Sequence, residues 1–204
     1  MVSQLANAII TYLFNIIMMQ LVGEHGVAAI TILLYGQFLF NAFYLGFTIG
    51  ISPIVGFQYG AGDKQKLRNI YHTSFLFVAV SSVFMAVIAI VLSPTIVTIF
   101  TDDPATYELA AAGFRLFAIN FLFSGISITS SGFFTALSNG TISAVISFCR
   151  TLGFIVLSLL ILPKFLGITG AWIAIPVAEF CTLLVTGVMH FVYFWKPGIR
   201  NYLR

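Results

Sequence analysis

Charge is scarce in this sequence. Only 7% of its 204 residues are Asp, Glu, Lys or Arg, and 60% are hydrophobic, whereas an ordinary soluble domain is about 25% charged and about 45–50% apolar. The nine Lys and Arg are scattered along the chain, so the clustered basic face of a nucleic-acid-binding protein is missing. This composition excludes an ordinary soluble domain and indicates a protein whose apolar residues are covered by lipid.

Motifs of metal sites and of enzymes are absent as well. Cys149 and Cys181 lie in or beside apolar runs without a CxxC or a Cys/His spacing, so we expect two packing residues and neither a disulfide nor a metal site. The sequence has no HExxH, no GxSxG and no paired intramembrane aspartates, and its three histidines lie far apart. We therefore expect no enzyme, no resident cofactor and no nucleic-acid partner.

Long apolar runs separated by short polar breaks predict helices that cross a membrane. The alternating pattern of membrane β-barrel strands is not present. The runs end at the breaks GEHG, GAGDKQK, SP, SNG, PKFLG and KPG. The sequence thus predicts an all-α integral membrane protein, folded as a single bundle of six transmembrane helices. The expected spans are about 4–22, 27–59, 66–92, 105–137, 143–162 and 169–195.

Two of these spans are longer than a bilayer requires. A helix needs about 20 residues to cross the hydrocarbon core, and the second and fourth spans have thirty-odd. We expect them to tilt, to project into water, and to bend. The expected bends are at Gly46, Gly50 and Pro53 in the second span, or at Gly125 and Gly132 in the fourth.

The positions of Lys and Arg set the expected orientation. We place the loop GAGDKQKLR in the cytoplasm, which puts both termini there and predicts a multi-pass protein of the inner or plasma membrane. Only Arg115 and Lys164 then lie outside, together with the acids of the GEHG and TDDP breaks. The basic residues on the cytoplasmic side are Lys64, Lys66, Arg68, Arg150, Lys196, Arg200 and Arg204.

Polar residues recur at helical spacing inside the apolar spans. At about 100° per residue, the Asn, Gln, Ser and Thr of the first, second and fourth spans each gather on one face. Ser and Thr alone fit ordinary helix–helix contacts, but an amide that faces lipid is costly. We therefore predict a shared polar cavity for flat, apolar or cationic molecules. Its candidate lining residues are Asn7, Thr11, Asn15, Gln37, Asn41, Tyr44, Asn120, Ser127, Ser131 and Trp172.

One acid, Glu179, lies inside the sixth span, in the stretch AWIAIPVAEFCTLLVTG. It is roughly 14 Å along the helix from Gly170, near mid-membrane, where an acid costs about 2.5–3.5 kcal/mol on insertion scales. Trp172, Thr186 and His190 share its face, so we expect its direct partner to come from another helix. A proton, Na⁺ or a cationic substrate can supply the counter-charge. The alternative is a protonated structural Glu that never ionises.

Three longer stretches occur in order along the chain. ISPIVGFQYGAGDKQKLRNI closes the second span with Pro53 and a run of spaced glycines before a basic turn. SGFFTALSNGTISAVISFCR closes the fourth span, and LPKFLGITGAWIAIPVAEF leads into the sixth, where Pro176 precedes Glu179 by three residues. Together they resemble the multidrug and toxic-compound extrusion (MATE) family of cation-coupled efflux transporters. The hinge and motif candidates are Pro53, Gly56, Gly60, Gly62 and Pro176.

The resemblance implies two six-helix lobes that rock around a central cavity. This sequence resembles the second, C-terminal lobe, so the expected partners are an N-terminal six-helix lobe, from the same gene or a split one, the lipid bilayer and a small organic cation. Some branches of the family carry cation-binding acids on the first and fourth spans of this lobe, but neither span contains an acid here. Glu179 therefore remains the candidate for coupling to H⁺ or Na⁺.

We expect half of a cation-coupled multidrug antiporter, and two alternatives stay open. One is half of a lipid-linked oligosaccharide flippase of the same superfamily, which a cavity rich in Arg or Lys would favour; only Arg115 and Arg150 lie near, and both are interpreted as helix-end residues. The other is a non-transporting membrane fragment. In the antiporter, Pro53 is expected to act as a hinge, with a static kink as its alternative.

Overall fold

The computed structural model describes residues 2–195, and the side chains of residues 5–194. Within them the chain is helical apart from short turns, and no strand occurs. The expected basic residues Lys196, Arg200 and Arg204 lie outside the described residues. The elements are α1 (Val2–Val22), α2 (Glu24–Gly60), α3 (Lys64–Phe100), α4 (Pro104–Phe117), the 3₁₀ turn η1 (Ala118–Asn120), α5 (Phe121–Ala136), α6 (Gly140–Phe148), the π-helical segment η2 (Cys149–Gly153) and α7 (Phe154–Trp195).

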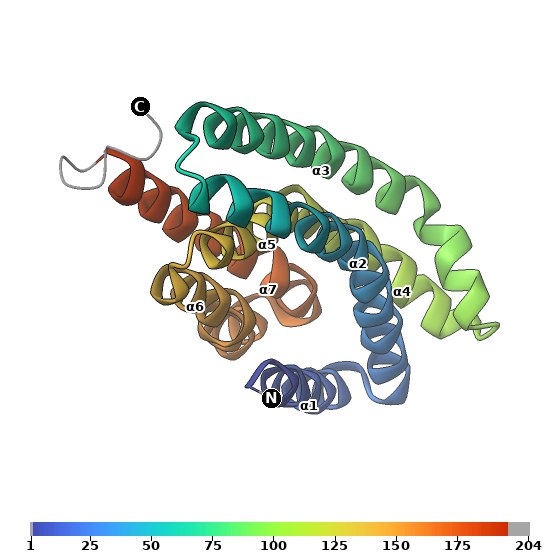
Figure 1. The fold of residues 1–204 in the computed structure, drawn as a ribbon. Helices are drawn as coiled ribbons and strands as arrows, with labels where there is room; N and C mark the ends of the chain where they lie inside the picture. Colours follow the sequence, from blue (N-terminus) through green and yellow to red (C-terminus); the bar gives the residue numbers. More distant parts are fainter. Residues whose placement is uncertain (1, 196–204) are drawn as a thin grey trace.

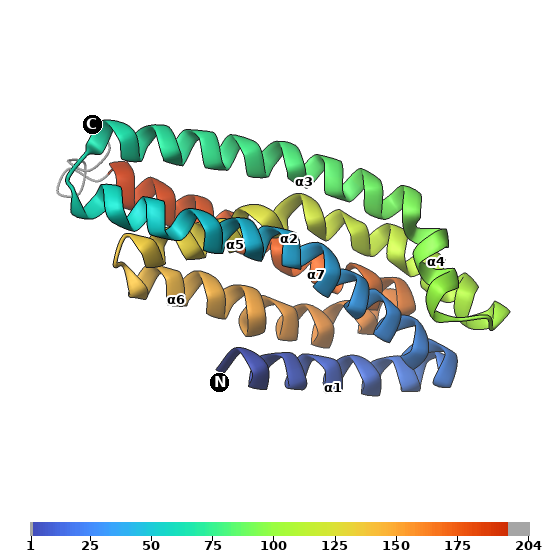
Figure 2. The same ribbon diagram turned by 45° about the vertical axis from the view of Figure 1, so that its right-hand side comes forward.

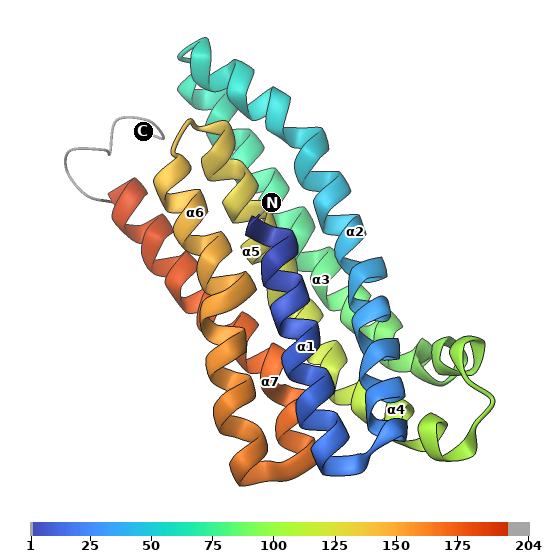
Figure 3. The same cartoon turned by 90° about the horizontal axis from the view of Figure 1, so that it is seen from below.

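The last helical stretch, Gly140–Phe194, crosses the bundle twice. A straight helix of its 55 residues would be about 80 Å long, far more than a hydrocarbon core of about 30 Å. Gly167 breaks it, with φ 56° and ψ −134°, a backbone conformation that residues with a Cβ rarely adopt. Figure 3 shows the chain reversing there. The part of the chain that the structure describes thus forms a membrane bundle of six helical passes, because the last of its five long apolar stretches contains two passes joined at Gly167.

The third helix continues beyond the end that the sequence predicted. We expected it to stop at the break SP, near Leu92, but α3 runs through Pro94 to Phe100. Proline removes one backbone hydrogen bond and kinks a helix without necessarily ending it. Figures 1 and 2 show α3 changing direction in its last turns.

The 3₁₀ turn η1 interrupts the α-helical hydrogen bonding of the fourth span. The side-chain amide of Asn120 donates to the carbonyl oxygen of Phe117 at 2.7 Å, a local bond that competes with the regular helical ladder. Gly125 and Gly132 instead allow helices to approach closely. A Cβ at Gly132 would lie 2.0 Å from Cγ2 of Thr48, and one at Gly125 would lie 2.6 Å from the ring of Tyr44.

α5 is the central helix of the bundle, and it packs against α2, α3, α6 and α7. In the most apolar 18-residue segment of the stretch Pro104–Ala136, half of the residues are buried within the protein. In the corresponding segments of the other long stretches, only 17–22% are buried. The remaining helices surround it, with α1 alongside η2 and α7 (Figure 2). Polar residues on α5 are therefore presented to several neighbours at once.

The two ends of the bundle are named here by their glycine turns. The Gly23 end contains Gly23, the loop 101–103 and the reversal at Gly167. The Gly62 end contains the loops 61–63 and 137–139 (Figure 3).

Candidate functional site

A buried ion pair lies in the middle of the bundle. Nε of Arg150 is 3.0 Å from Oε1 of Glu179, and the side chain of Glu179 is 1% exposed while that of Arg150 is 18% exposed. Nε of Arg150 and Oε2 of Glu179 have no hydrogen-bond partner among the described residues. The expectation that the partner of Glu179 comes from another pass of the chain agrees with this contact.

Arg150 is positioned by the π-helical segment η2. We interpreted Arg150 as a helix-end residue on the cytoplasmic side, and this is wrong, because the helical pass runs from Gly140 to the break at Gly167 and Arg150 lies well inside it. A π-bulge inserts an extra residue into a helical turn and rotates the side chains that follow. It turns Arg150 toward Glu179, which a regular periodicity does not predict. Arg150 must also be removed from the cytoplasmic residues that set the orientation.

The polar face of α1 points away from the bundle. Asn7 and Thr11 are exposed and Asn15 is half-buried, whereas the opposite face, which includes Phe14 and Met18, is fully buried. Gln37 and Asn41 on α2 are half-buried. Asn7 and Thr11 thus lie on the exposed face of α1, whereas the side-chain oxygens of Asn15 and Asn41 are buried without a hydrogen-bond partner among the described residues.

The polar candidates on the inner side of α2 join it to α5. The hydroxyl of Tyr44 donates to the carbonyl oxygen of Phe121 at 3.3 Å, and Thr48 donates to Thr129 at 3.3 Å. Tyr44 is fully buried. Its ring occupies the space above Gly125, so Tyr44 packs inside the lobe.

Ser131 belongs to a hydroxyl cluster between α5 and α6. Its Oγ lies 3.0 Å from Oγ of Ser143 and 2.8 Å from Oγ of Ser147. Thr135 adds a bond of 2.7 Å to Ser143. Each of the four hydroxyls has a partner, as the packing alternative for Ser and Thr describes.

Asn120 and Ser127 are fully buried on the inner side of the bundle. Ser127 donates to the carbonyl oxygen of Phe123 at 3.4 Å. The carbonyl oxygen of the Asn120 side chain has no protein partner. Both residues lie on the part of the chain that packs against α7, the helix of Glu179.

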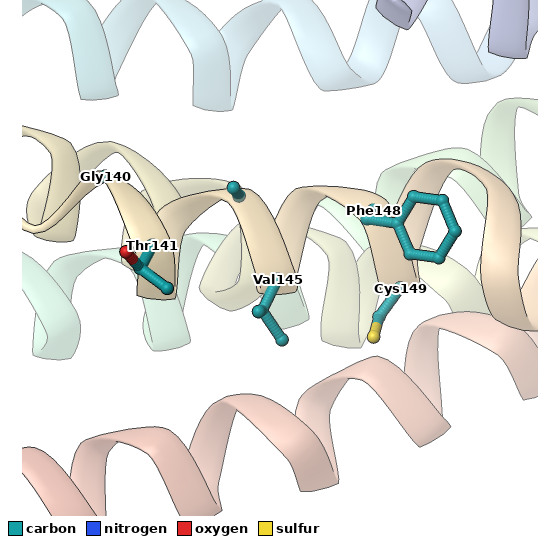
Figure 4. A pocket seen from close by; sticks show the side chains of 6 residues that line it. Gly140, Thr141, Val145, Phe148 and Cys149 are labelled. Atoms are coloured by element: carbon teal, nitrogen blue, oxygen red, sulfur yellow. The ribbon is translucent and has the colours of Figure 1, made fainter.

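Neither of two hollows on the surface of the described residues contains the ion pair. One, of ≈ 570 Å³, is lined by residues of a single stretch, Gly140–Cys149, with no charged side chain, and Figure 4 shows Val145, Phe148 and Cys149 along it. The other, of ≈ 550 Å³, lies at the Gly23 end between His25, Glu108 and Trp172. Trp172 is 3% exposed, and its indole ring covers Gly113.

Comparison with known proteins places the chain in a family. The family model described as MatE matches residues 1–160. The chain belongs to the MATE family. Multidrug and toxin extrusion protein 1 of Homo sapiens is 28% identical over 143 residues, 68% of this chain and 24% of that protein. The protein of the same name from Mus musculus is 24% identical over 141 residues, 67% of this chain and 24% of that protein.

Solved structures agree with the fold. An outward-facing multidrug resistance MATE family transporter of the MOP superfamily has a TM-score of 0.84 at 21% identity, covering 92% of this chain and 43% of that chain. A MOP superfamily transporter from Pyrococcus furiosus, described by a reverse polarity of its binding pocket, has a TM-score of 0.84 at 20% identity. The match covers 96% of this chain and 45% of that chain. The chain thus spans less than half of these transporters, and the match spans about a quarter of the curated relatives.

The MATE match includes Arg150 but ends before Glu179. The motif residues of α2 lie at the Gly62 end of the MATE fold. Pro53 is exposed within an uninterrupted helix, and Gly62, with φ +70°, ends the turn after α2. Gly56 approaches the carbonyl oxygen of Ala136, whereas Gly60 has nothing within 4 Å.

Pro176 is buried one turn before Glu179 in α7. A proline cannot donate to the carbonyl oxygen four residues earlier, which here is that of Trp172. The backbone next to the acid is therefore more polar than a regular helix would leave it.

The sequence analysis missed a histidine network in this MATE lobe. Nδ1 of His190 lies 3.1 Å from the hydroxyl of Tyr71, and Nε2 lies 3.0 Å from Oγ of Ser130. The rings of Phe75 and Phe134 pack on the imidazole. The position of His190 on the face of Glu179 was visible in the sequence, but its partners on two other helices were not.

Proposed function

We propose that this chain forms one six-helix lobe of a two-lobe transporter that exports small organic cations in exchange for a cation, by alternating access. MATE membership supports the class, and the short span of the chain within its relatives supports a second lobe. The exposed Asn7 and Thr11 of α1 support it too, because amides and hydroxyls that face lipid are costly. We further propose the cell membrane as its location, with the Gly62 end in the cytoplasm.

The observation that carries the proposed coupling role is the 3.0 Å pair of Glu179 with Arg150. Acids inside membrane helices are costly and mark ion pathways. Arg150 serves as the resident counter-charge of Glu179, and an incoming cation competes with it. A proton needs only this one carboxylate. A bound Na⁺ would need further oxygen ligands.

The same pair disfavours the flippase alternative. An anionic lipid-linked sugar requires net positive charge in the cavity, but Glu179 neutralises Arg150. Arg115, the other Arg near the spans, is exposed on the last turn of α4. Arg150, which Glu179 neutralises, therefore does not offer a free positive charge to a phosphate.

The test is efflux of a fluorescent organic cation such as ethidium from proteoliposomes that contain the chain and its complementary lobe. Glu179→Gln should abolish efflux driven by a pH gradient, whereas Glu108→Gln, a change of an exposed acid at the Gly23 end, should not. Unchanged efflux in the Glu179 variant would refute the coupling role. A parallel run with a Na⁺ gradient identifies the ion. Efflux by the chain without the second lobe would refute the two-lobe proposal.

The orientation is tested by labelling single cysteines in a background without Cys149 and Cys181. We expect a cysteine at exposed Gln65 to react only from the cytoplasm and one at exposed Asp102 only from outside. The reverse pattern would show that the orientation is wrong.

A further inference from the structure

Nine buried side-chain nitrogen or oxygen atoms of the described residues have no hydrogen-bond partner; five belong to α1, α2, α3 and η2, and four to α7 and the η1–α5 segment. Most buried polar groups in proteins have a hydrogen-bond partner. Four side chains on α7 and on the η1–α5 segment have a buried oxygen without a protein partner. They are Asn120, Ser124, Glu179 and Thr186, and each is at most 1% exposed.

Two contacts fix how the helices align. Trp172 of α7 covers Gly113 of α4, and His190 of α7 bonds Ser130 of α5. The residue numbers differ by 59 in the first contact and by 60 in the second. α7 and the α4–η1–α5 stretch therefore run parallel in constant register. With this register, Asn120 is level with Glu179.

The same register orders the other side chains. Ser127 is level with Thr186, and Ser124 lies between this level and that of Glu179. Along α7, Glu179, Thr186 and His190 fall within roughly 40° of one direction at about 100° per residue. On the facing η1–α5 segment, the side chains of Asn120, Ser127 and Ser130 lie within roughly 80° of one direction. We call this contact, from Asn120 and Glu179 to Ser130 and His190, the α5–α7 seam.

The α5–α7 seam leads toward the Gly62 end. The distance along the helices is about 10 Å from the level of Glu179 and Asn120 to that of Thr186 and Ser127, and about 5–6 Å from there to His190 and Ser130, so that a short file of bridging waters would be needed to connect them. At its last level His190 contacts both Ser130 and Tyr71. His190 is half-buried and lies five residues before the end of α7.

We infer that the α5–α7 seam holds a file of internal waters through which Glu179 exchanges a proton with water at the Gly62 end, by way of His190. The inference rests on the proposed function only in taking Glu179 as the acid that binds the proton. The step is a proton relay: a proton from water at the Gly62 end passes by way of His190 and the hydrogen-bonded waters to the carboxylate, each carrier regaining a proton as it gives one up, and the reverse transfer returns it. An internal water needs two to four polar partners, and the unpaired oxygens supply them.

Few other charged or titratable groups face this route. Arg150 on η2 is the only charged side chain within ion-pair distance of Glu179 among the described residues, and Tyr71 of α3 faces His190. Arg115 on α4 and Tyr12 on α1 are exposed, and the thiols of Cys149 and Cys181 are half-buried. The competing route passes along Arg150, whose side chain is 18% exposed.

The test follows the C=O stretching band of protonated Glu179 by infrared spectroscopy, with the full chain in lipid nanodiscs. Glu179→Gln assigns the band. After transfer from H₂O to D₂O, the rate at which the band shifts reports how fast water reaches the carboxyl. Thr186→Val removes a hydroxyl from the seam without changing its volume, and should slow this exchange by about tenfold. Thr186→Ser should restore it.

The matched control is Thr182→Val, one turn earlier on α7. Thr182 is equally buried, but its hydroxyl donates to the carbonyl oxygen of Ala178 and so offers no free group to the seam. In the Thr182→Val variant, we expect the C=O band of Glu179 to shift in D₂O at the same rate as in the unchanged protein. Equal rates in the two valine variants would overturn the inference and favour the route along Arg150. Absence of a protonated-carboxyl band at every pH at which the chain stays folded would also overturn it. Neither result depends on transport, so the proposed function is judged separately.

Discussion

α5 presents polar side chains to two neighbours, and they differ in one respect. Toward α6, each hydroxyl of Ser131, Thr135, Ser143 and Ser147 bonds at least one other hydroxyl of the set. Toward α7, the oxygens of the α5–α7 seam are at least as well buried, but several have no protein partner. The hydroxyls of the α5–α6 cluster find hydrogen-bond partners within the cluster, whereas several oxygens of the seam have none.

The difference separates two uses of polar residues inside a membrane bundle. A closed set of hydroxyls contributes modest packing energy and has nothing left to bind a ligand. Unpaired oxygens next to a buried carboxylate cost stability, so a bundle retains them where they interact with something that comes and goes. Sequence composition does not distinguish the two, because both regions contain Ser and Thr at helical spacing.

The largest expected effect comes from breaking the ion pair at the head of the seam. Arg150→Met should lower the free energy of unfolding by about 3–5 kcal/mol, since it leaves a buried carboxylate without its counter-charge. Changing Glu179→Met as well should recover most of this loss. Denaturant unfolding in lipid bicelles measures both.

Arg115→Met is the matched control for this prediction, because that Arg is exposed on α4 and its loss should change stability by no more than about 0.5 kcal/mol. Equal effects of the two Arg substitutions would mean that the carboxyl of Glu179 is neutral without Arg150. The seam and the α5–α6 hydroxyl cluster would then be alike in lacking charge.

The α5–α6 hydroxyl cluster should respond in stability alone. Ser131→Ala removes the hydroxyl that joins Ser143 to Ser147, and should cost about 0.6–1.7 kcal/mol of unfolding free energy. Thr186→Val, in the seam, should cost less, because the lost hydroxyl has no protein partner. Proton exchange at Glu179 should be unchanged in the Ser131 variant. A larger stability loss for Thr186→Val would reverse the assignment of the two regions.

Much of the fold followed from the sequence, because apolar runs and polar breaks are local signals. The breaks at GEHG and GAGDKQK match the ends of α1 and α2 within a few residues. The position of Glu179 on the polar face of its helix also followed from periodicity. What failed depends on departures from regular helix. Arg150 lies in a π-helical segment, a 3₁₀ turn interrupts the fourth span, and α3 continues past a proline.

The sequence also did not predict which side chains of different helices contact each other. Stripes on α5 and α6 were visible separately, but no single sequence shows that Ser131 meets Ser147. The same holds for the contact of His190 with Tyr71 and Ser130. These depend on the register and rotation of helices that lie far apart in the chain.

The smallest expected effect belongs to a polar group outside the spans, where water supplies what the bundle interior cannot. Asp103 caps α4, and its Oδ2 accepts from the hydroxyl of Thr106 at 2.6 Å and from its amide at 2.9 Å. These bonds, with the nearby imidazole of His25, lower the pKa of Asp103 from its ordinary value of 3.8. A carboxyl whose pKa is lowered by folding stabilises the folded state above its unfolded pKa, and this contribution is lost as pH falls through the lowered value.

The first turn of α4 should therefore lose protection only below about pH 4, as measured by hydrogen exchange at the Thr106 amide after correction for its intrinsic rate. Asp103→Asn should remove this acid-dependent step, because an asparagine cap does not titrate. Asp102→Asn, at the neighbouring exposed acid, should leave it unchanged. If the step persists in Asp103→Asn, it originates elsewhere, and the buried acid of the seam becomes the group to examine. If it disappears, the acid response of the Gly23 end is separate from proton exchange at Glu179.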